Sequence, residues 1–432
     1  MGENYRDEWT TPVKLPVLDI KAKGFRIKEL GGGKQTKSLK FLDQNGAEWA
    51  LRSVDKDVTP ALPKLIRNKF TVAVVQDMVS AANPYAPLTV PPLAEALGIR
   101  SAPPTFYFVP DDTAFGQYSD IFANTVCLLE KRDLLLGVET PGTENMLKDI
   151  LDNHKAVIDQ EAFLKARLLD MLIADWDRHY DQWKWAPVNA KGITHYEALP
   201  KDRDQTYFYS QGWLLKFIRL FGMDFSVGLS ESTSNLVKLN SVARTLDELL
   251  LNGLEREDWK RIAEQFQQQL SDDLLRSAVK KMPPQIYALH GYAITEKLLK
   301  RKRTLPEDVM TYYRSLAKKV TVYGTDKAER FYLLGNRDSV VLTVTEPGKT
   351  IPFYQRTFHA SETKKVTLLG LDGDDIFACE KGLQTPIHFK IDGGKGKNQY
   401  NLDRMFNGKF KESDMDAKAY LKKLRKPLRI RD

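Results

Sequence analysis

Cysteine is scarce in this chain of 432 residues, which has only Cys127 and Cys379, far apart in the sequence. Two distant cysteines give no basis for a disulfide framework or for a metal site made of cysteine thiolates. Histidine is also scarce, and the six histidines do not form a convincing ligand set for a metal-dependent phosphohydrolase. That enzyme class is therefore the weakest of the alternatives that the sequence leaves open.

Long hydrophobic runs are absent as well. No apolar run approaches the ~20 residues that cross a membrane as a helix, so we expect no transmembrane segment in this chain. The first residues, MGENYRDEWTTPVKLPV, lack the apolar core of a signal peptide. The sequence therefore does not indicate a cellular compartment, although so polar a start also suits an internal segment of a longer exported protein.

Charge of one sign is not in large excess. The chain has 65 Lys and Arg against 57 Asp and Glu, a net charge of +8, and its 42% hydrophobic content is ordinary for a folded protein. So mild an excess suits an anionic ligand and gives no reason to expect a nucleic-acid partner. The length is sufficient for two or three domains with cores of their own.

The first 130 residues are expected to form a mainly antiparallel sheet with one prominent helix inserted. Asp43 to Gly46 reads Asp-Gln-Asn-Gly, which predicts a tight turn because Asn-Gly tolerates positive φ. The glycines Gly31, Gly32 and Gly33 are expected to interrupt the first two strands as a loop. Apolar patterns predict strands over residues 24–30, 36–42, 48–54, 105–109 and 125–130, and helices over residues 60–82 and 91–97.

The remainder is expected to be helical and then β, which makes the fold class α+β. A boundary is expected near residue 320, where short β runs replace amphipathic helices. Helices are predicted over residues 142–175, 258–270, 272–282 and 306–319, and a strand over residues 194–199. We divide the chain into a lead-in (1–23), a β-rich lobe (24–132), a mainly helical lobe (133–319), a small all-β domain (320–410) and a basic tail (411–432).

Residues 170–204 hold the strongest functional signal. Crowded carboxylates repel one another and are costly to bury, so such a cluster is either a solvated acidic surface or a cation site. Large aromatic residues alternate with these acids, which favours the cation site. The acids are Asp170, Asp175, Asp177, Asp181, Asp202 and Asp204.

Two parts of this stretch have the composition of a phosphoryl-transfer site. The motif DRHYDQ places Asp177 and Gln182 five residues apart, and Asp202 and Asp204 follow a strand-like run. Phosphoryl transfer needs an acid that positions the attacking hydroxyl and oxygen ligands for magnesium beside it. We interpret Asp170, Asp175 and Asp181 as structural. His179 is more typical of a hydrogen-bonding loop residue than of a metal ligand.

The N-terminal half offers groups for the phosphates of a nucleotide. The run GGGKQTK can present backbone N–H groups and Lys37 to phosphate oxygens, although such a run is more often a simple loop. Arg52 occupies the strand position of a nucleotide-clamping cation, with Lys37 and Lys40 as competitors. Gln76 or Asp77 on the following helix could orient that cation, or mark an exposed helix edge.

The order of these elements resembles the atypical protein-kinase-like fold, as in HipA-type and phosphoinositide kinases, and most of all the CotH spore-coat kinases. DRHYDQ resembles their Asp-Arg-His loop, Leu129-Glu130 their hinge, and Gly116-Gln117-Tyr118 the motif before it. The resemblance covers roughly residues 24–300 and implies a bilobal kinase-like fold with ATP, magnesium or manganese as cofactors. It implies a catalytic loop of Asp177, Arg178 and His179, metal ligands Gln182, Asp202 and Asp204, and a nucleotide site of Gly31, Gly32, Gly33, Lys37, Arg52, Gln76 and Glu130.

Two departures from the family pattern bear on activity. Gln182 stands where the family has asparagine, and Arg52 stands where it has lysine. The extra methylene changes the metal geometry, and the two cations bind phosphate differently. Relatives of this fold also transfer adenylyl groups, so the transferred group stays open. A nucleotide-binding scaffold without activity is the main alternative, and the acceptor is an unidentified protein or small molecule.

The chain also resembles two other kinds of protein more weakly. The phrases GGGKQTKSL, LRSVDKD and DWDRHYDQW resemble the middle region of long Gram-negative envelope proteins, which implies a cell-envelope setting. The run from Gly393 to Tyr400 resembles one calcium-binding RTX repeat, and the run from Gly370 to Phe377 a partial one. Calcium is then expected at Asp372, Asp374, Asp375 or Asn398, but isolated turns of this kind are more often plain β-turns.

Overall fold

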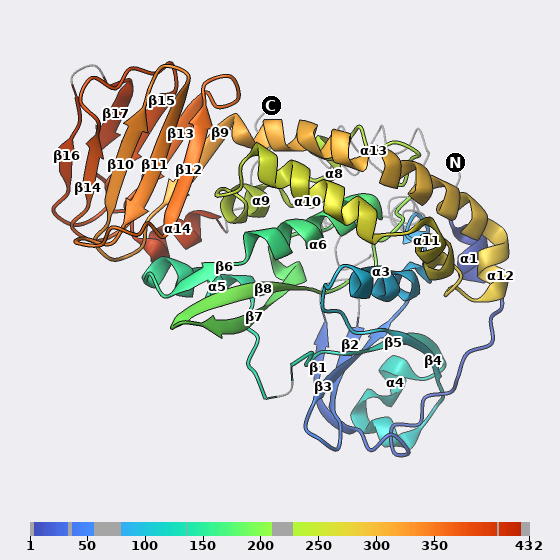
Figure 1. The fold of residues 1–432 in the computed structure, drawn as a ribbon. Coiled ribbons are helices and arrows are strands. Elements are labelled where there is room, and N and C mark those ends of the chain that lie inside the picture. Colours follow the sequence, from blue (N-terminus) through green and yellow to red (C-terminus); the bar gives the residue numbers. More distant parts are fainter. Residues whose placement is uncertain are drawn as a thin grey trace, which may run out of the picture.

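A computed structural model describes residues 4–32, 37–55, 79–135, 137–209, 228–403 and 406–424. An antiparallel sheet, a mainly helical region and a pair of β-sheets follow one another along the chain (Figure 1). The α+β class expected from the sequence is therefore confirmed. Among the described residues, no helix is both long and apolar enough to span a membrane.

The N-terminal sheet has five antiparallel strands in the order β1-β2-β3-β5-β4. Its core includes Leu39, Phe41, Leu51 and Leu129, all nearly or fully buried. The predicted tight turn is confirmed, with a hydrogen bond from the Gly46 N–H to the Asp43 carbonyl. The elements of this part are α1 (Arg6–Thr10), β1 (Arg26–Gly32), β2 (Lys37–Leu42), β3 (Glu48–Ser53), α3 (Val90–Ala96), β4 (Thr105–Val109), α4 (Ser119–Phe122) and β5 (Thr125–Lys131), with 3₁₀ turns at Ala86–Thr89 and Thr113–Tyr118.

Part of the expected glycine loop is strand. Gly31 and Gly32 continue β1 and pair with Ser38 and Lys37 of β2, so the prediction that they interrupt the strand is wrong. Glycine weakens a strand but does not prevent the ladder hydrogen bonds that the neighbouring strand offers. Gly33 lies outside the described residues. Residues 60–78 of the helix expected over residues 60–82 also lie outside the described residues, and Gln76 is among them.

The helical region follows β5 and contains a small sheet in the order β6-β8-β7. The expectation that residues 142–175 are helical is confirmed for two helices and wrong for the short strand between them. Asn153 ends the first helix in an extended conformation, and the Asp159 side chain caps the second by accepting the Ala162 N–H. The elements are α5 (Thr143–Asp152), β6 (Ala156–Ile158), α6 (Gln160–Leu172), β7 (Trp183–Ala190), β8 (Ile193–Pro200), α8 (Leu236–Leu239), α9 (Arg244–Leu250), α10 (Arg256–Gln269), α11 (Asp272–Val279), α12 (Pro284–Ile286) and α13 (Tyr292–Ala317).

Helix α13 contains the proline that the sequence places at a helix start. Pro306 lies in the interior of α13, so the predicted beginning of this helix is wrong. Proline has no N–H for the carbonyl four residues earlier, which belongs to Lys302. The Gln267 side chain of α10 donates to that carbonyl at 2.9 Å and so replaces the missing donor. A tertiary contact therefore allows the helix to continue.

The C-terminal β region has two sheets, ordered β12-β11-β10-β14-β16 and β17-β15-β13-β9, with a shared apolar core. Its last five strands alternate between the sheets, and each of the last three is parallel to the strand two places earlier, so the chain winds as a coil. Figure 1 shows these sheets at one end, beside the end of α13. The strands are β9 (Lys319–Tyr323), β10 (Arg330–Gly335), β11 (Ser339–Thr345), β12 (Tyr354–His359), β13 (Lys365–Leu369), β14 (Ile376–Cys379), β15 (His388–Asp392), β16 (Gln399–Asn401) and β17 (Gly408–Lys411).

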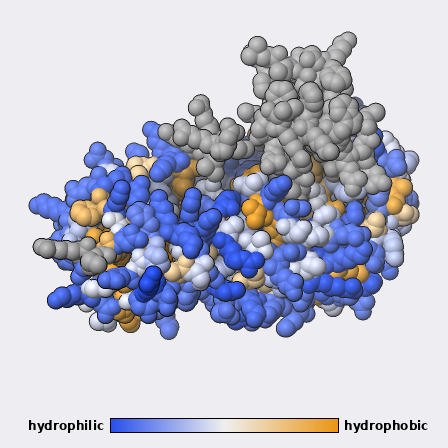
Figure 2. Space-filling view, turned by 90° about the horizontal axis from the view of Figure 1, so that it is seen from above, coloured by the Kyte–Doolittle hydropathy of each residue, from blue (hydrophilic) through white to orange (hydrophobic). Residues whose placement is uncertain are grey.

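The chain after β17 returns to the helical region. Helix α14 (Ala417–Leu424) buries Ala417, Tyr420 and Leu421, and it packs against α5. The segment expected to be a basic tail therefore contains a packed helix, and residues 425–432 lie outside the described range. Figure 2 shows one face of the molecule covered mainly by hydrophilic side chains, with hydrophobic ones in small groups.

Candidate functional site

Two segments that the sequence singled out meet around one arginine. The first is the loop between α6 and β7, and the second is the chain that follows β8. Arg178 is fully buried and donates to the main-chain carbonyls of Lys201 (2.7 Å), Asp202 (3.1 Å) and Gln182 (3.3 Å). Its guanidinium also lies over the ring of Trp183. Arg178 thus holds the Asp-Arg-His loop against the Asp-x-Asp segment.

A buried ion-pair network holds the Arg178 side chain in place. Asp170 on α6 is fully buried and accepts from Arg178, Arg167 and Arg203. Arg167 also donates to Asp247 of α9 at 2.9 Å, which ties the network to the helical core. Burial lowers the pKa of Arg203 to about 9 and also lowers that of Arg178. The interpretation of Asp170 as a structural residue agrees with these contacts.

The N-terminal sheet reaches the site through Arg52. This β3 side chain places Nη1 2.6 Å from Asp202 Oδ1. Asp202 has a φ of 56°, in the left-handed region that few non-glycine residues adopt. The nearby carboxylates Asp202, Glu130 and Asp204 all act to raise the pKa of Arg52, against the opposing effect of its burial. The sequence-predicted cation and one predicted metal ligand are therefore in direct contact.

The charges of Asp202 and Asp204 also act on Asp177. Burial raises the pKa of Asp177; the neighbouring His179 opposes this, and the charges of Asp204 and Asp202 add to it. A raised pKa is a property of many catalytic carboxylates, although structural clusters show it too. The three acids that the sequence selected thus interact with one another in the folded chain.

His179 and Gln182 have local contacts. The His179 Nδ1 accepts the Asp181 N–H and begins the short 3₁₀ turn Tyr180–Gln182. The Gln182 amide nitrogen lies 3.3 Å from His179 Nε2, and Gln182 is 8% exposed. Asp204 accepts a hydrogen bond from the Gln205 side chain at 3.2 Å. The arrangement agrees with the expectation that His179 is a loop-forming residue.

Three more charged residues lie at the candidate site: the sequence reasoning set Asp175 aside as structural and did not single out Lys201 or Arg132. Asp175 is 1% exposed, and burial raises its pKa to about 7; its oxygens lie 3.8 Å from Arg178 and from Arg203. Burial, together with the charges of Arg132, Lys184 and Arg52, lowers the pKa of Lys201 to about 8. Arg132 pairs with Glu130 at 3.4 Å. Only their places beside Asp177, Asp202 and Glu130 in the sequence could have indicated them.

The remaining predicted nucleotide-site residues lie on the N-terminal sheet. Glu130 is on β5, and Lys37 begins β2, where its N–H donates to the Ser53 side chain at 3.3 Å. The Lys37 side chain is exposed. Gly31 and Gly32 pair with the start of β2. Gly33 and Gln76 lie outside the described residues, so their predicted roles stay predictions.

Metal binding also stays a prediction. Within the described ranges, no group of three or more His, Cys, Asp or Glu side chains is arranged to hold a metal ion. The predicted set of Gln182, Asp202 and Asp204 has two carboxylates and one amide, so it falls short of such a group by composition. All its donors are the oxygen atoms that magnesium and manganese prefer, and the cluster carries negative charge that a cation would offset. The residues therefore fit a hard divalent cation.

The turns that suggested calcium have other contacts. Asp374 accepts the Lys397 N–H at 2.7 Å, and Asn398 accepts the Asp375 N–H at 3.1 Å. Asp372 accepts the N–H of Gly373 within its own turn. Two of these hydrogen bonds join one turn to the other, so the expectation of isolated β-turns is wrong. Calcium binding stays a prediction.

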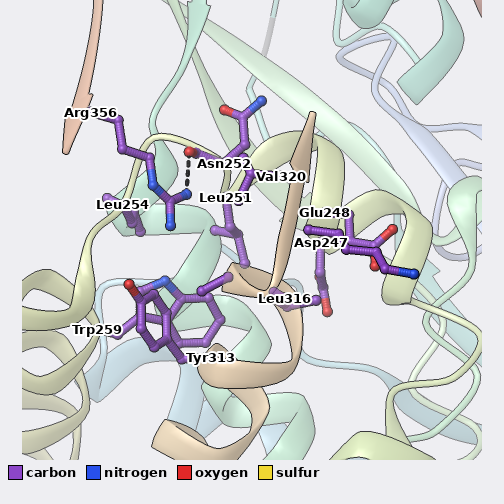
Figure 3. A pocket seen from close by; sticks show the side chains of 12 residues that line it. Asp247, Glu248, Leu251, Asn252, Leu254, Trp259, Tyr313, Leu316, Val320 and Arg356 are labelled. Atoms are coloured by element: carbon purple, nitrogen blue, oxygen red, sulfur yellow. Dashed lines mark hydrogen bonds between the residues drawn. The ribbon is translucent and has the colours of Figure 1, made fainter. Parts of the chain in front are cut away.

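One pocket lies away from the predicted site, between the helical region and the C-terminal sheets (Figure 3). Trp259 and Tyr313 form one side, and Arg356 donates to the Asn252 carbonyl at 2.5 Å across the other. No residue that the sequence selected lines this pocket. It marks the junction of two regions, since its lining comes from α9, α10, α13, β9 and β12.

The sequence matches no family model and no curated protein. Solved structures with a similar arrangement include a Helicobacter pylori proinflammatory kinase, CtkA, with 10% identity over 68% of this chain and 98% of that one, at a TM-score of 0.38. The Golgi casein kinase with Mn and ADP bound has 12% identity over 70% of this chain and 74% of that one, at a TM-score of 0.34. A further structure of the Golgi casein kinase has 11% identity over 70% of this chain and 74% of that one, at a TM-score of 0.34. At these values the similarity carries no conclusion about activity.

Proposed function

We propose that the chain is a kinase-like transferase that uses ATP with magnesium or manganese. One observation carries the proposal: Arg52 of the N-terminal sheet pairs with Asp202, in the segment that Arg178 clamps to the Asp177 loop. A transferase of this kind needs a phosphate-binding cation, metal-binding oxygens and a hydroxyl-orienting acid in one place. Three parts of the chain, far apart in sequence, supply them.

Each residue of the candidate site has a separate role in this proposal. Arg52 binds phosphate oxygens after exchanging its partner Asp202 for the nucleotide, and Arg132 and Lys201 add positive charge nearby. Gln182, Asp202 and Asp204 would hold the metal, which offsets phosphate charge when bound. Asp177 accepts the proton of the acceptor hydroxyl. At the same time the hydroxyl oxygen forms a bond to the transferred phosphorus, and the bond between that phosphorus and the leaving group breaks. Transfer of the γ-phosphoryl group releases ADP, and transfer of the adenylyl group releases pyrophosphate.

The acceptor is a protein or small molecule of the cell envelope in this proposal. The setting rests on the sequence resemblance to envelope proteins alone. Fractionation of cells that produce the natural protein tests it separately from the chemistry.

Thermal unfolding with ATP and magnesium tests nucleotide binding. We expect a magnesium-dependent rise in the unfolding temperature of the wild type, which Asp204→Ala reduces. The pair of Arg100 and Glu197 offers a matched control, because Glu197→Ala removes a carboxylate elsewhere. Absence of any magnesium-dependent shift in the wild type would refute the proposal.

Labelled nucleotide separates the two transfer reactions. Label from the γ-position in the product indicates phosphoryl transfer, and label from the α-position indicates adenylyl transfer. The second candidate function is a nucleotide-binding scaffold, favoured by Gln182 and Arg52, which stand where the family pattern has asparagine and lysine. Nucleotide binding without transfer of either label would support the scaffold and exclude the transferase.

A further inference from the structure

The two sheets of the C-terminal β region each turn one face inward, onto their shared apolar core, and the other face outward. Side chains alternate between the two faces along a strand. On β13, for example, Val366 and Leu368 are fully buried in the core, and Lys365 and Thr367 therefore point outward. The parallel register of the neighbouring strands then shows which of their residues share that outer face.

The outer face of the sheet β17-β15-β13-β9 is basic. Lys365 lies opposite Lys319 of β9 on one side and opposite His388 of β15 on the other. In the next row, Lys390 of β15 lies opposite Lys409 of β17. The outward positions are Lys319, Thr321 and Tyr323 on β9, Lys365, Thr367 and Leu369 on β13, His388, Lys390 and Asp392 on β15, and Lys409 and Lys411 on β17.

Acids of the same face do not neutralise most of these lysines. Asp392, the acid among the outward positions, is buried and pairs with Lys411, whose Nζ lies 2.6 Å from Asp392 Oδ2. In the described part of the chain, no ion pair includes Lys365, Lys390 or Lys409. Their positive charges are therefore available to a partner. The basic face, as the name is used below, consists of Lys365, His388, Lys390 and Lys409.

Lysine at the edges of the sheet has an explanation within the fold. A charged side chain on an edge strand hinders pairing with another sheet, which accounts for Lys319 on β9 and Lys409 on β17. Glu248 of α9 also lines the pocket beside Lys319. Lys365 and Lys390, in contrast, lie on the interior strands β13 and β15, where no edge needs this protection. The interior lysines therefore need another explanation.

Lysines of the basic face also lie beside one another. Adjacent strands of a sheet are about 4.8 Å apart, so Lys390 and Lys409, which are paired in register, are close neighbours. Like charges directly opposite each other destabilise a sheet. Thr321 and Thr367 lie opposite each other in the same sheet, which shows that neutral pairs suit it. The lysine pair therefore costs the fold stability, and it points to a use outside the fold.

The outer face of the other sheet shows that this charge is not a general property of the β region. No lysine and no acid occupies an outward position on its described strands. Arg330 is charged, and its guanidinium lies over the ring of Tyr332. The lysines are therefore confined to one of the two outer faces. The outward positions of this second sheet are Arg330, Tyr332 and Leu334 on β10, Ser339, Val341, Thr343 and Thr345 on β11, Gln355, Thr357 and His359 on β12, Ile376 and Ala378 on β14, and Gln399 and Asn401 on β16.

The composition of the basic face fits an anionic lipid surface better than a protein or a nucleic acid. Protein interfaces are depleted of lysine and are anchored by aromatic side chains or arginine, and single-stranded nucleic acid stacks on exposed aromatic rings. The aromatic residue of this outer face, Tyr323, instead packs on Tyr420 of α14, with ring centroids 6.3 Å apart. Lysines on several strands can each meet a different anionic headgroup, and each adds to the attraction.

We propose that the basic face docks the C-terminal β region onto an anionic lipid surface. The lysine ammonium groups pair there with the phosphate groups of the lipids. The contact is electrostatic, because Leu369, the apolar residue of this outer face, is 8% exposed and has little surface to insert among lipid tails. Binding is therefore reversible, and it weakens as salt screens the charges. Docking does not depend on the proposed transferase activity.

Sedimentation of the full chain with lipid vesicles tests the proposal. We expect the chain to sediment with vesicles of phosphatidylcholine and phosphatidylglycerol, and to stay in solution with vesicles of phosphatidylcholine alone. Sodium chloride at about 1 M, which shortens the Debye length to about 3 Å, should release the chain. Absence of binding to the anionic vesicles at low salt would overturn the proposal, as would equal binding to both kinds of vesicle.

A triple variant with Lys365→Gln, Lys390→Gln and Lys409→Gln removes the lysines of the basic face. One lysine near an anionic surface contributes about a fivefold factor in binding, so the triple variant should bind anionic vesicles roughly 100-fold more weakly. The loss of like-charge neighbours should leave its unfolding temperature equal to that of the wild type or higher. Unchanged vesicle binding by the folded triple variant would contradict the proposal.

Exposed lysines of the helical region give a matched control. Lys260 lies on α10, and Lys280 and Lys281 follow α11. Their replacement by glutamine makes the same change in net charge at a distance from the basic face in the sequence. This control variant should bind like the wild type. An equal loss of binding in both triple variants would mean that net charge alone drives it, and would overturn the proposal.

Chemical labelling of lysines gives a second measurement that needs no variant. The wild type is treated with a water-soluble acetylating reagent, with and without anionic vesicles, and the labelled lysines are identified by mass spectrometry. Vesicles should protect Lys365 and Lys390 and leave Lys260 reactive. Equal protection of these lysines would contradict docking through the basic face.

Polyglutamate and a single-stranded oligonucleotide represent the other anionic partners. Each is titrated into the wild type and into the triple variant of the basic face. We expect both to bind the wild type more weakly than anionic vesicles do. Tighter binding of either polymer than of the vesicles, lost in the triple variant, would overturn the lipid proposal and assign the basic face to that class of partner.

Discussion

Arg52 Nη1 lies 2.6 Å from Asp202 Oδ1, and this contact joins the N-terminal sheet to the acidic segment after β8. Both side chains are partly buried, at 18% and 25% exposure, so the pair is neither a fully solvated nor a fully dry one. In the proposed complex, the phosphate oxygens of the nucleotide would replace Asp202 as the partner of Arg52, and the metal ion would replace Arg52 as the partner of Asp202. We therefore treat the pair as the resting arrangement of the proposed site.

Replacement of Arg52 should weaken nucleotide binding. Arg52→Ala removes a cation that can contact two phosphate oxygens, and a charge-assisted hydrogen bond contributes about 1.5–3 kcal/mol, which is roughly 10-fold to 150-fold in affinity. Titration of ATP with magnesium, followed by fluorescence or calorimetry, measures the change. Arg100→Ala is the control and should bind like the wild type. Equal affinity in Arg52→Ala and wild type would contradict the role of Arg52.

Transfer activity should depend on the ionised form of Asp177. Its pKa is raised by burial, so the carboxylate that accepts a proton becomes available only above the ordinary range of an aspartate. The rate should therefore rise with pH on the acidic side. Asp177→Asn should lower the rate by about 10²–10⁴ and leave nucleotide affinity nearly unchanged. Loss of binding together with activity would show that Asp177 has a structural role instead.

Arg178 should be the most sensitive residue of the site for folding. Arg178→Met keeps much of the side-chain volume but leaves Asp170 short of a cation and three main-chain carbonyls short of a donor. We expect a loss of about 3–5 kcal/mol, the usual cost of removing one partner of a buried ion pair. Urea unfolding measures it. The control Arg261→Ala breaks an exposed pair with Glu161 and should cost less than about 1 kcal/mol.

The proline in α13 allows a double-mutant test. Gln267→Ala removes the donor to the Lys302 carbonyl and should cost about 0.5–1.5 kcal/mol of unfolding free energy. In a Pro306→Ala background the new N–H serves that carbonyl, so the same substitution should cost less. Unfolding of the four chains gives the interaction energy. An equal cost in both backgrounds would mean that Gln267 does not compensate for Pro306.

Local patterns predicted much of the fold. Alternating apolar residues marked β4 as Thr105–Val109, and the Asn-Gly turn marked the hairpin between β2 and β3, because these signals act over a few residues. The same local reasoning failed at Gly31, Asn153 and Pro306. There the deciding interactions come from a neighbouring strand, an adjacent helix cap or the side chain of another helix.

The candidate site shows the same division. The sequence alone determined which residue types the proposed chemistry uses, since the order Asp177, Gln182, Asp202 and Asp204 can be read without a fold. Only the tertiary structure decided that Arg52 meets Asp202, that Arg178 is a buried clamp, and that Lys201 and Arg132 join the site. Charge interactions depend on distance and burial, and neither quantity is encoded by spacing along the chain.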